Sequence, residues 1–248
     1  MHSRKPSCTS CDATNLSQQI AALNWAALTT SIDELNYAIT APLLSPEHCA
    51  DLAALYGQAP MFRSTIVMSR YGFGRGEYKY FAEPLPALVQ TLRQALYPPL
   101  AQIANQWATQ LGMPASWPDQ HETLRQQCHA AGQTRPTPLM LRYGPGDYNC
   151  LHQDLYGDIH FPLQAVIMLD RPGVDFDGGV LTLVENRPRM QSRCETVPLA
   201  QGQVAIIPVR ERPRVGTRGP YRTQIRHGVS SVHRGLRRTL GIIFHDAA

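Results

Sequence analysis

The second half of the chain, from Pro136 onward, is the part of the sequence that most restricts the fold. It consists of short apolar runs divided by glycine, proline and aspartate: TPLMLRY, PLQAVIML, GGVLTLVE, MQSRCETVPL, GQVAIIPV, RHGVSSVH and RRTLGIIF. Runs of this length bounded by turn residues are typical of β-strands, and no helix-length segment separates them. Strands that follow one another so closely pair antiparallel, so this half predicts a β-sandwich or a small barrel.

The first half has a different, helical texture. The stretch SPEHCADLAALY has Ser45 as a helix cap and Pro46 at the first helical position. Residues 64–69 (STIVMS) predict a strand, and residues 86–112 predict two helices or one kinked helix around Pro98 and Pro99. We therefore expect a single α+β domain over residues 16–248.

Within that domain, a helical part (16–135) is expected to buttress a β-core (136–246). Residues 1–15 predict a disordered tail, and their pair Cys8 and Cys11 has no second pair to complete a zinc ribbon. The six cysteines are scattered, so reduced thiols are expected. No apolar run reaches the ~18–20 residues of a membrane helix, and the start lacks a secretory signal. These features predict a cytoplasmic protein.

The stretch NCLHQDLYGD places His152 and Asp154 two residues apart. On a strand, residues i and i+2 point to the same side, so both side chains are expected to face the barrel interior. A pair alone is weak, because chance produces such pairs in a chain with nine histidines. A second histidine on a late strand would complete the two-histidine, one-carboxylate triad that binds Fe(II) and leaves coordination positions free.

Three downstream histidines compete for this third position: His227, His233 and His245. We favour His227, because His233 lies close to a predicted turn and His245 lies near the C-terminus. Arg237 follows ten residues after His227, on the next predicted strand. An enzyme that chelates a dicarboxylic acid at iron needs a cation for the far carboxylate, and an arginine fork pairs with it bidentately.

His152-x-Asp154, His227 and Arg237 resemble the metal triad and cofactor anchor of the 2-oxoglutarate/Fe(II)-dependent oxygenases, whose fold is a double-stranded β-helix (a cupin-like jelly roll). The stretches RYGPGDYNCLHQDLYG, GGVLTLVENRPRMQSR and RHGVSSVHRGLRRTLGIIFHDA are similar to a prokaryotic branch labelled nucleic-acid oxygenase, some members of which are labelled prolyl-hydroxylase-like. The resemblance spans about residues 45–246. It implies a dioxygenase that uses Fe(II), 2-oxoglutarate and O2.

Carried over residue by residue, the resemblance makes His152, Asp154 and His227 the iron ligands and Arg237 the anchor of 2-oxoglutarate. Tyr143 matches a tyrosine that contacts the same carboxylate in prolyl-hydroxylase-like relatives. Gln164 is the only polar side chain in FPLQAVIML. An inward polar group has a partner, which is either the cofactor or the neighbouring backbone. Arg238 points the opposite way from Arg237 on a strand, so we expect it at the surface.

The substrate stays open at this point. Oxidative demethylation of damaged nucleic-acid bases, a DNA-repair activity, is favoured by the family label and by nine arginines between residues 210 and 238. The whole chain has 21 arginines and two lysines, so this run also fits a general arginine bias. Prolyl, peptidyl or small-molecule hydroxylation is the alternative, favoured by the prolyl-hydroxylase-like spacing of His227 and Arg237. A non-catalytic jelly-roll module with a structural metal is the rival from another class.

Two further segments have open roles. Residues 70–81 (RYGFGRGEYKYF) combine glycine, aromatic and basic residues, which predicts either an ordinary hairpin or a flap over the substrate. Tyr71, Phe73, Tyr78 and Tyr80 are its candidates for stacking on a base. The loop predicted at residues 210–222 either contacts substrate or closes the barrel.

Overall fold

The computed structural model describes the chain from residue 10 to residue 248. Its helices are α1 (Ser10–Ala21), α2 (Trp25–Leu35), α3 (Pro46–Leu55), α4 (Ala87–Gln110) and α5 (His121–Ala130), with short 3-10 turns η1 (Ala59–Met61) and η2 (Met68–Arg70). The start of α3 follows the sequence prediction, because the Ser45 hydroxyl accepts a hydrogen bond from the His48 amide and Pro46 is the first helical residue.

Helix α1 corrects the expectation of a disordered tail, and helix α4 decides between two helices and one. Helix α1 begins at Ser10, inside the segment 1–15 that was predicted to be a disordered tail. It is stabilised by Leu16 and Ile20, which are buried in the same core as α4. Helix α4 is one continuous helix with Pro98 and Pro99 inside it. Cys8 and the side chain of Cys11 lie outside what the structure describes.

A seven-stranded antiparallel sheet forms the larger layer of the β-core. Its order is β1 (Ala38–Ile39), β11 (Val204–Pro208), β7 (Leu163–Met168), β15 (Arg237–Ile243), β5 (Leu139–Tyr143), β4 (Glu77–Phe81) and β2 (Phe62–Val67). Three of these strands, β1, β2 and β4, come from residues 16–135, the part of the chain expected to be mainly helical, and β2 overlaps the strand predicted at residues 64–69. The sheet therefore extends beyond the expected β-core of residues 136–246.

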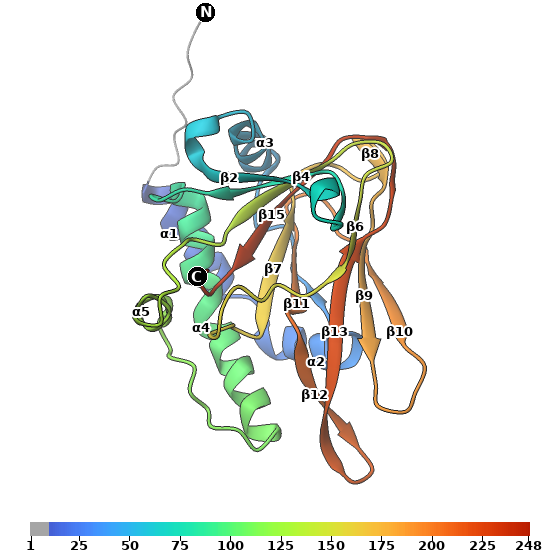
Figure 1. Cartoon of the computed structure of the whole chain (residues 1–248). Helices are drawn as coiled ribbons and strands as arrows, with labels where there is room; N and C mark the ends of the chain where they lie inside the picture. The colour runs from blue at the N-terminus through green and yellow to red at the C-terminus, as the bar shows by residue number, and fades with distance from the viewer. Residues whose placement is uncertain (1–9) are drawn as a thin grey trace, which may run out of the picture.

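The smaller sheet has six strands and faces the larger one. Its order is β10 (Arg193–Val197), β9 (Leu181–Asn186), β13 (Gly219–Val229), β6 (Tyr148–His152) and β3 (Gly74–Arg75), and β12 (Glu211–Gly216) pairs with β13. The strands β8 (Phe176–Gly178) and β14 (Val232–Gly235) form a separate two-stranded sheet. The predicted loop 210–222 is thus a β12–β13 hairpin, which projects from the body of the sandwich (Figure 1).

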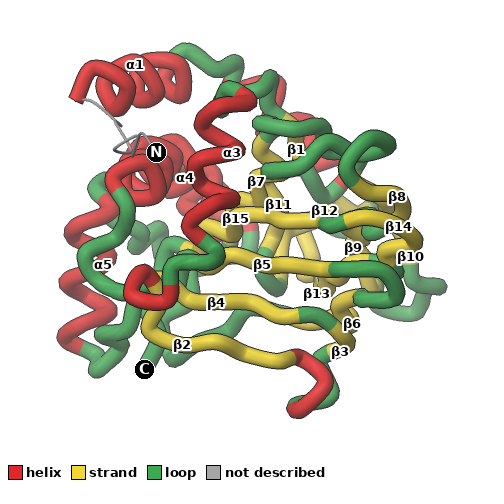
Figure 2. Tube along the Cα trace, turned by 90° about the horizontal axis from the view of Figure 1, so that it is seen from above, coloured by secondary structure: helices red, strands yellow, loops and turns green. Residues whose placement is uncertain are grey.

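The helices lie on one side of the larger sheet, as Figures 1 and 2 show. The main core is the apolar layer between α4 and this sheet, and it includes Leu96, Leu100 and Ile167. A second cluster, with Leu183 and Ile207, fills the space between the two sheets. Packing on both faces of the larger sheet holds its strands rigid, and this rigidity positions the side chains that project between the sheets.

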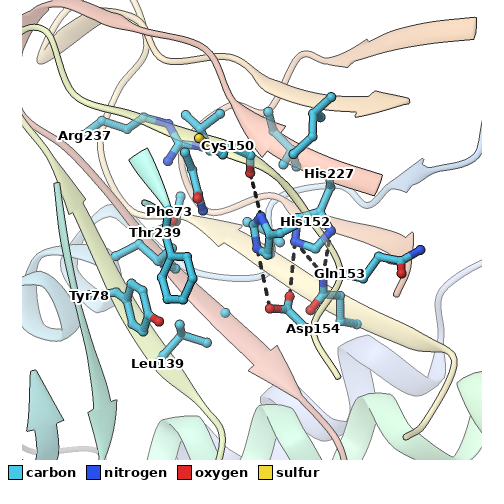
Figure 3. A pocket seen from close by; sticks show the side chains of 18 of the residues that line it. Phe73, Tyr78, Leu139, Cys150, His152, Gln153, Asp154, His227, Arg237 and Thr239 are labelled. Atoms are coloured by element: carbon cyan, nitrogen blue, oxygen red, sulfur yellow. Dashed lines mark hydrogen bonds and ion pairs between the residues drawn. The ribbon is translucent and has the colours of Figure 1, made fainter. Parts of the chain in front are cut away.

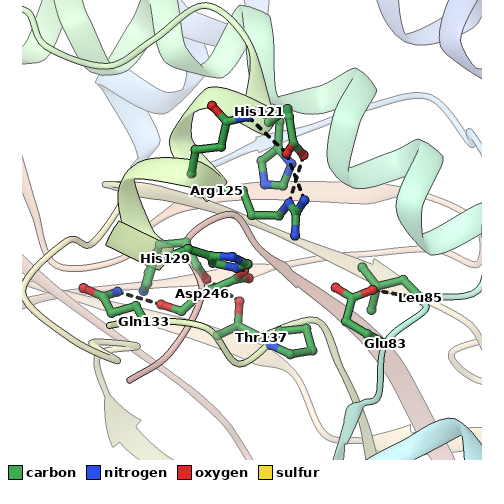
Figure 4. Close-up of polar contacts among 12 residues, drawn as sticks. Glu83, Leu85, His121, Arg125, His129, Gln133, Thr137 and Asp246 are labelled. Carbon is green, nitrogen blue, oxygen red and sulfur yellow. Dashed lines mark hydrogen bonds and ion pairs between the residues drawn. The ribbon is translucent and has the colours of Figure 1, made fainter. Parts of the chain in front are cut away.

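A buried polar cluster ties the end of the chain to the helical layer (Figure 4). The Asp246 carboxylate accepts hydrogen bonds from Arg93 of α4 at 2.7 Å and from His129 of α5 at 2.9 Å. The Gln133 amide donates to the Asp246 carbonyl at 2.6 Å. Nearby, Nε2 of His121 lies 2.9 Å from the Phe244 carbonyl. These contacts fix the C-terminal end of β15 against α4 and α5.

Acidification is expected to weaken the fold through two buried histidines. Burial lowers the pKa of His121 to about 4 and that of His245 to about 3, against an ordinary value of 6.5. In the unfolded chain both take up protons below pH 6.5, while the folded protein keeps them neutral. Stability is therefore complete above pH 6.5 and falls by about 1.4 kcal/mol per histidine for each pH unit below it.

Between pH 7 and pH 5 this amounts to a loss of about 4 kcal/mol in the free energy of unfolding. Urea unfolding at the two pH values measures it, and His121→Gln is expected to remove about half of the loss. The pKa values of the pocket histidines His152 and His227 are shifted in opposite directions, so their contributions to the pH dependence have opposite signs. An equal urea midpoint at pH 7 and pH 5 would contradict this account.

Candidate metal centre and cofactor pocket

The predicted metal ligands meet between the two sheets, on neighbouring strands of the smaller one. His152 is the last residue of β6, and its cross-strand partner on β13 is His227. Asp154 lies two residues beyond the end of β6 and is buried. The pairing of β6 with β13 thus brings together residues 75 positions apart in sequence.

The three side chains form a compact group. Nε2 of His227 lies 3.1 Å from Oδ2 of Asp154, and Nε2 of His152 lies 3.5 Å from Oδ1. The two imidazole centroids are 4.3 Å apart. One ligand atom from each residue lies within 4.8 Å of the others. Among the described residues this is the only such group of metal-ligating side chains. Its donors, two imidazole nitrogens and one carboxylate oxygen, fit Fe(II).

The ionisation of the group suits a cation. Burial opposes charge on Asp154, but the imidazoles of His152 and His227 hold the pKa of this carboxyl well below its usual range. Burial, together with neighbouring His152, lowers the pKa of His227. An ionised Asp154 and an unprotonated His227 are the states that a divalent metal requires of these ligands. Against the opposing effect of burial, Asp154 raises the pKa of His152, so metal binding would displace a proton from that imidazole.

Two contacts orient the ligands. Nδ1 of His152 lies 2.8 Å from the Cys150 carbonyl, which places the proton on Nδ1 and leaves Nε2 free for a metal. The Tyr156 hydroxyl donates a hydrogen bond to Oδ1 of Asp154 at 2.7 Å. Sequence reasoning assigned no role to Tyr156. Its position two residues after Asp154 could have indicated a side chain on the same side as the carboxylate. The segment is not a regular strand, however, so this spacing alone does not predict the contact.

Replacing Tyr156 with phenylalanine is expected to weaken Fe(II) binding about tenfold, because contacts of this kind to a metal ligand have effects of 10–100-fold. Isothermal titration of the metal-free protein under argon measures the affinity. Tyr97→Phe is the matched control, since the Tyr97 hydroxyl is also buried, lies outside the cavity and has no hydrogen-bond partner among the described residues. Equal losses in both variants would contradict a specific role for the Tyr156 hydroxyl.

Arg237 is the most unusual residue of the pocket. It lies on β15, is completely buried, and none of its three guanidinium nitrogens has a hydrogen-bond partner among the described residues. The guanidinium lies over the ring of Tyr143, its cross-strand partner on β5, at 5.4 Å from the centroid. Gly179 makes room for it, because a Cβ at this position would lie 2.8 Å from Cδ of Arg237. A buried cation without a partner indicates a missing anion.

The other predicted residues have distinct surroundings. The Tyr143 hydroxyl is also buried without a hydrogen-bond partner among the described residues. The Gln164 amide contacts the His227 ring, 3.1 Å from Nε2, instead of the neighbouring backbone. Arg238 points away from Arg237 as expected, but it is only partly exposed and pairs with buried Asp170 at 2.6 Å. Arg238 therefore lies at the edge of the surface, where a carboxylate that follows the end of β7 pairs with it.

The triad and Arg237 line one cavity of about 310 Å³ between the sheets. Figure 3 shows Arg237 and Thr239 on one side of it and the triad on the other. Thr239 was missed by sequence reasoning, although it lies two residues after Arg237 on the same face of β15. Phe73 and Tyr78 contribute aromatic walls. Of the four aromatic candidates in segment 70–81, Tyr80 is buried and Tyr71 does not line the cavity.

The arginine-rich segment 210–238 is not a continuous basic surface. Six of its nine arginines form ion pairs with acidic residues, among them Arg214 with Glu185 at 2.7 Å. Arg237 faces the cavity. Arg218 and Arg226 remain exposed without an ion pair in the described chain, at the hairpin tip and on the outer face of β13. The geometry therefore places little free positive charge of this segment beside the cavity.

Solved structures share this arrangement of helices and sheets. A Pseudomonas putida prolyl-4-hydroxylase matches with a TM-score of 0.51 and 16% identity, covering 90% of this chain and 99% of the other. A 2OG-Fe(II) oxygenase family oxidoreductase from Burkholderia pseudomallei matches with a TM-score of 0.55 and 15% identity, covering 92% and 94%. The fold is thus the double-stranded β-helix of the 2-oxoglutarate/Fe(II) oxygenases, as predicted.

The family follows from sequence. A family model described as "Oxygenase, catalysing oxidative methylation of damaged DNA" matches residues 76–247, and the chain belongs to this family. Two uncharacterized Mycobacterium tuberculosis proteins, from strains CDC 1551 / Oshkosh and ATCC 25618 / H37Rv, are each 48% identical over 189 residues. The match covers 75% of this chain and 81% of each relative. The protein is an oxidoreductase of the oxygenase class, which confirms the prediction of an enzyme.

The residues present also fit the cofactors expected for this class. The donor set fits Fe(II), and the unpartnered Arg237 fits one carboxylate of 2-oxoglutarate. No helix in residues 10–248 is long and apolar enough to cross a membrane.

Proposed function

We propose that the protein is a 2-oxoglutarate- and Fe(II)-dependent dioxygenase in which His152, Asp154 and His227 hold the metal and Arg237 binds the far carboxylate of 2-oxoglutarate. The observation that carries this proposal is the guanidinium of Arg237, which is buried without a hydrogen-bond partner in residues 10–248, on the wall of the cavity that the triad also lines. A dicarboxylic acid that reaches from the metal to Arg237 supplies the missing anion.

The chain's own residues would bind and orient the reactants. Tyr143 lies beneath the guanidinium and offers its free hydroxyl to the same carboxylate. Gln164 lines the cavity and contacts His227, so it would hold that ring in place. The apolar wall around Leu141 and Val229 excludes water. When bound, Fe(II) and 2-oxoglutarate supply with O2 the oxidising power that hydroxylates a substrate C–H bond, with succinate and CO2 as the other products.

For the substrate we propose an N-methyl group on a damaged nucleic-acid base. The family description supports this choice, as does the aromatic wall of Phe73 and Tyr78, which suits a flat ring. Hydroxylation converts the N-methyl group into N-hydroxymethyl. That group then loses formaldehyde, and the nitrogen recovers its hydrogen. Hydroxylation of a prolyl residue is the second candidate, favoured by the likeness of fold to the Pseudomonas putida enzyme.

A product assay separates these possibilities. The protein, with Fe(II), ascorbate and 2-oxoglutarate, is incubated with a panel of single-stranded oligonucleotides that each carry one N-methylated base, and in parallel with proline-rich peptides. Demethylation gives formaldehyde and an oligonucleotide lighter by one CH2 unit. A peptide heavier by one oxygen, without formaldehyde, would favour the prolyl reading. No succinate with any substrate would favour the non-catalytic module.

A further inference from the structure

Residues 70–75 (RYGFGR), which we call the aromatic segment, are held against the strand that ends in a metal ligand. They run from η2 into β3, and Gly74 pairs with Asn149 of β6. The Phe73 carbonyl accepts a hydrogen bond from the Cys150 amide at 2.9 Å. Gly74 has a φ of 124°, and a Cβ there would lie 2.4 Å from the Tyr148 carbonyl oxygen. Glycine therefore allows the segment to approach β6 closely.

Two aromatic rings of this segment form an exposed stack at the cavity. The rings of Tyr71 and Phe73 are 5.5 Å apart and within 20° of parallel. Phe73 lines the cavity, whereas Tyr71 does not, so the stack leads outward from the cavity wall. Tyr71 is 59% exposed and Phe73 is 47% exposed. Leaving so much aromatic surface in water costs hydrophobic stabilisation, and an exposed group of this kind marks an interaction site.

Two free cations flank the stack. Arg70 and Arg75 are exposed, and neither forms an ion pair or side-chain hydrogen bond within residues 10–248. They differ in this respect from most arginines of segment 210–238, which are paired with acids. Because they have no partner in the fold, their charges are available to an anionic ligand.

We propose that the aromatic segment is the docking surface for an unpaired, single-stranded stretch of nucleic acid, an inference that rests on the proposed function. Bases stack on Tyr71 and Phe73, and Arg70 and Arg75 contact the phosphates on either side. This combination of stacking surfaces and cations is how proteins hold single strands without reading their sequence. A base inside a duplex has both faces covered by its neighbours, so the strand must be unpaired at this point. A neutral proline-rich peptide would use the rings but leave both cations unmatched.

Binding of an unmethylated probe tests the surface without any chemistry. Fluorescence anisotropy of labelled dT12 is measured under argon with the full chain, Fe(II) and 2-oxoglutarate. Tyr71→Ala and Phe73→Ala are each expected to weaken binding about tenfold, whereas Tyr71→Phe keeps the ring and binds like wild type. The double variant Arg70→Gln/Arg75→Gln is expected to reduce the slope of log affinity against log salt by about 1.4, the value for two phosphate contacts on a single strand.

Matched controls lie at the tip of the β12–β13 hairpin. Arg218 is exposed there and forms no ion pair with any described residue, and Val215 is 83% exposed. Arg218→Gln and Val215→Ala are expected to bind dT12 like wild type, and thermal unfolding checks that each variant is folded. The inference is overturned if the aromatic-segment variants bind like wild type, if the controls lose as much affinity, or if wild type binds a proline-rich peptide but not dT12.

The outcomes also separate this inference from the proposed function. If dT12 binds through the aromatic segment but no N-methylated strand releases formaldehyde, the demethylase proposal fails and the docking surface stands. If formaldehyde is released while the Tyr71 and Arg70/Arg75 variants bind dT12 normally, the docking surface fails and the demethylase proposal stands.

Discussion

Replacing Arg237 with methionine is expected to stabilise the protein in the absence of cofactors while abolishing its use of 2-oxoglutarate. The guanidinium is buried, and no group of the described chain forms a hydrogen bond with it, so folding removes its hydration without replacing it. Methionine fills similar space without a charge. We expect the free energy of unfolding of the metal-free variant to rise by about 2–3 kcal/mol, or about 5–10 °C in Tm. The same change is expected to weaken 2-oxoglutarate binding at least about 100-fold.

The neighbouring arginine provides the matched control. Arg238→Met removes the partner of Asp170, which is only 4% exposed, so this variant is expected to lose about 1–3 kcal/mol of stability. It should still bind 2-oxoglutarate, which stabilises the wild type by about 2.7 kcal/mol at 100 times its Kd. Thermal unfolding with and without metal and 2-oxoglutarate measures both effects. A destabilised Arg237→Met variant that still responds to 2-oxoglutarate would contradict the assignment.

Removal of a metal ligand has the second large expected effect. Asp154→Ala and His227→Ala each leave only two donors, and we expect Fe(II) affinity to fall by at least about 100-fold. Succinate formation from 2-oxoglutarate should fall below detection in both variants. The iron content of each variant after loading under argon reports its metal binding. The amount of succinate formed from 2-oxoglutarate reports its activity.

The alternative histidines of the sequence serve as controls for this prediction. His233 is exposed on β14 and lies outside the cavity, so His233→Ala should bind iron and form succinate like wild type. His245 is buried and does not line the cavity; its ring lies 6.0 Å from that of Tyr156, and its Nδ1 accepts a hydrogen bond from the Phe161 amide. If His233→Ala lost iron and His227→Ala retained it, His233 and not His227 would be the third metal ligand.

Much of the fold follows from local sequence signals. The short apolar runs and turn residues after Pro136 predict the antiparallel sheets, and Ser45 with Pro46 marks the start of α3. The long hairpin of β12 and β13 was not predicted, because Arg212 and Arg214 resemble surface loop residues in sequence. In the structure Arg212 is buried and donates to Asn36, a partner 176 positions away that no local pattern reveals.

The candidate site divides in the same way. His152, Asp154, His227 and Arg237 could be proposed from residue types and spacing, and the structure places all four on one cavity. Tyr156 could not, because its role depends on a hydroxyl reaching Oδ1 of Asp154 outside any regular element. The sequence also does not show which arginines of segment 210–238 carry a free charge, because it does not reveal which acidic residues pair with them.

The most direct test of the central claim is an anaerobic titration of the purified protein, first with Fe(II) and then with 2-oxoglutarate, followed by visible absorption. We expect one iron per chain and an iron-to-keto-acid charge-transfer band that appears when 2-oxoglutarate is added. The band should be absent in His227→Ala, and Arg237→Met should require at least about 100-fold more 2-oxoglutarate to show it. Wild-type protein that binds no iron, or binds it without giving this band, would contradict the assignment of the cavity as an Fe(II) and 2-oxoglutarate site.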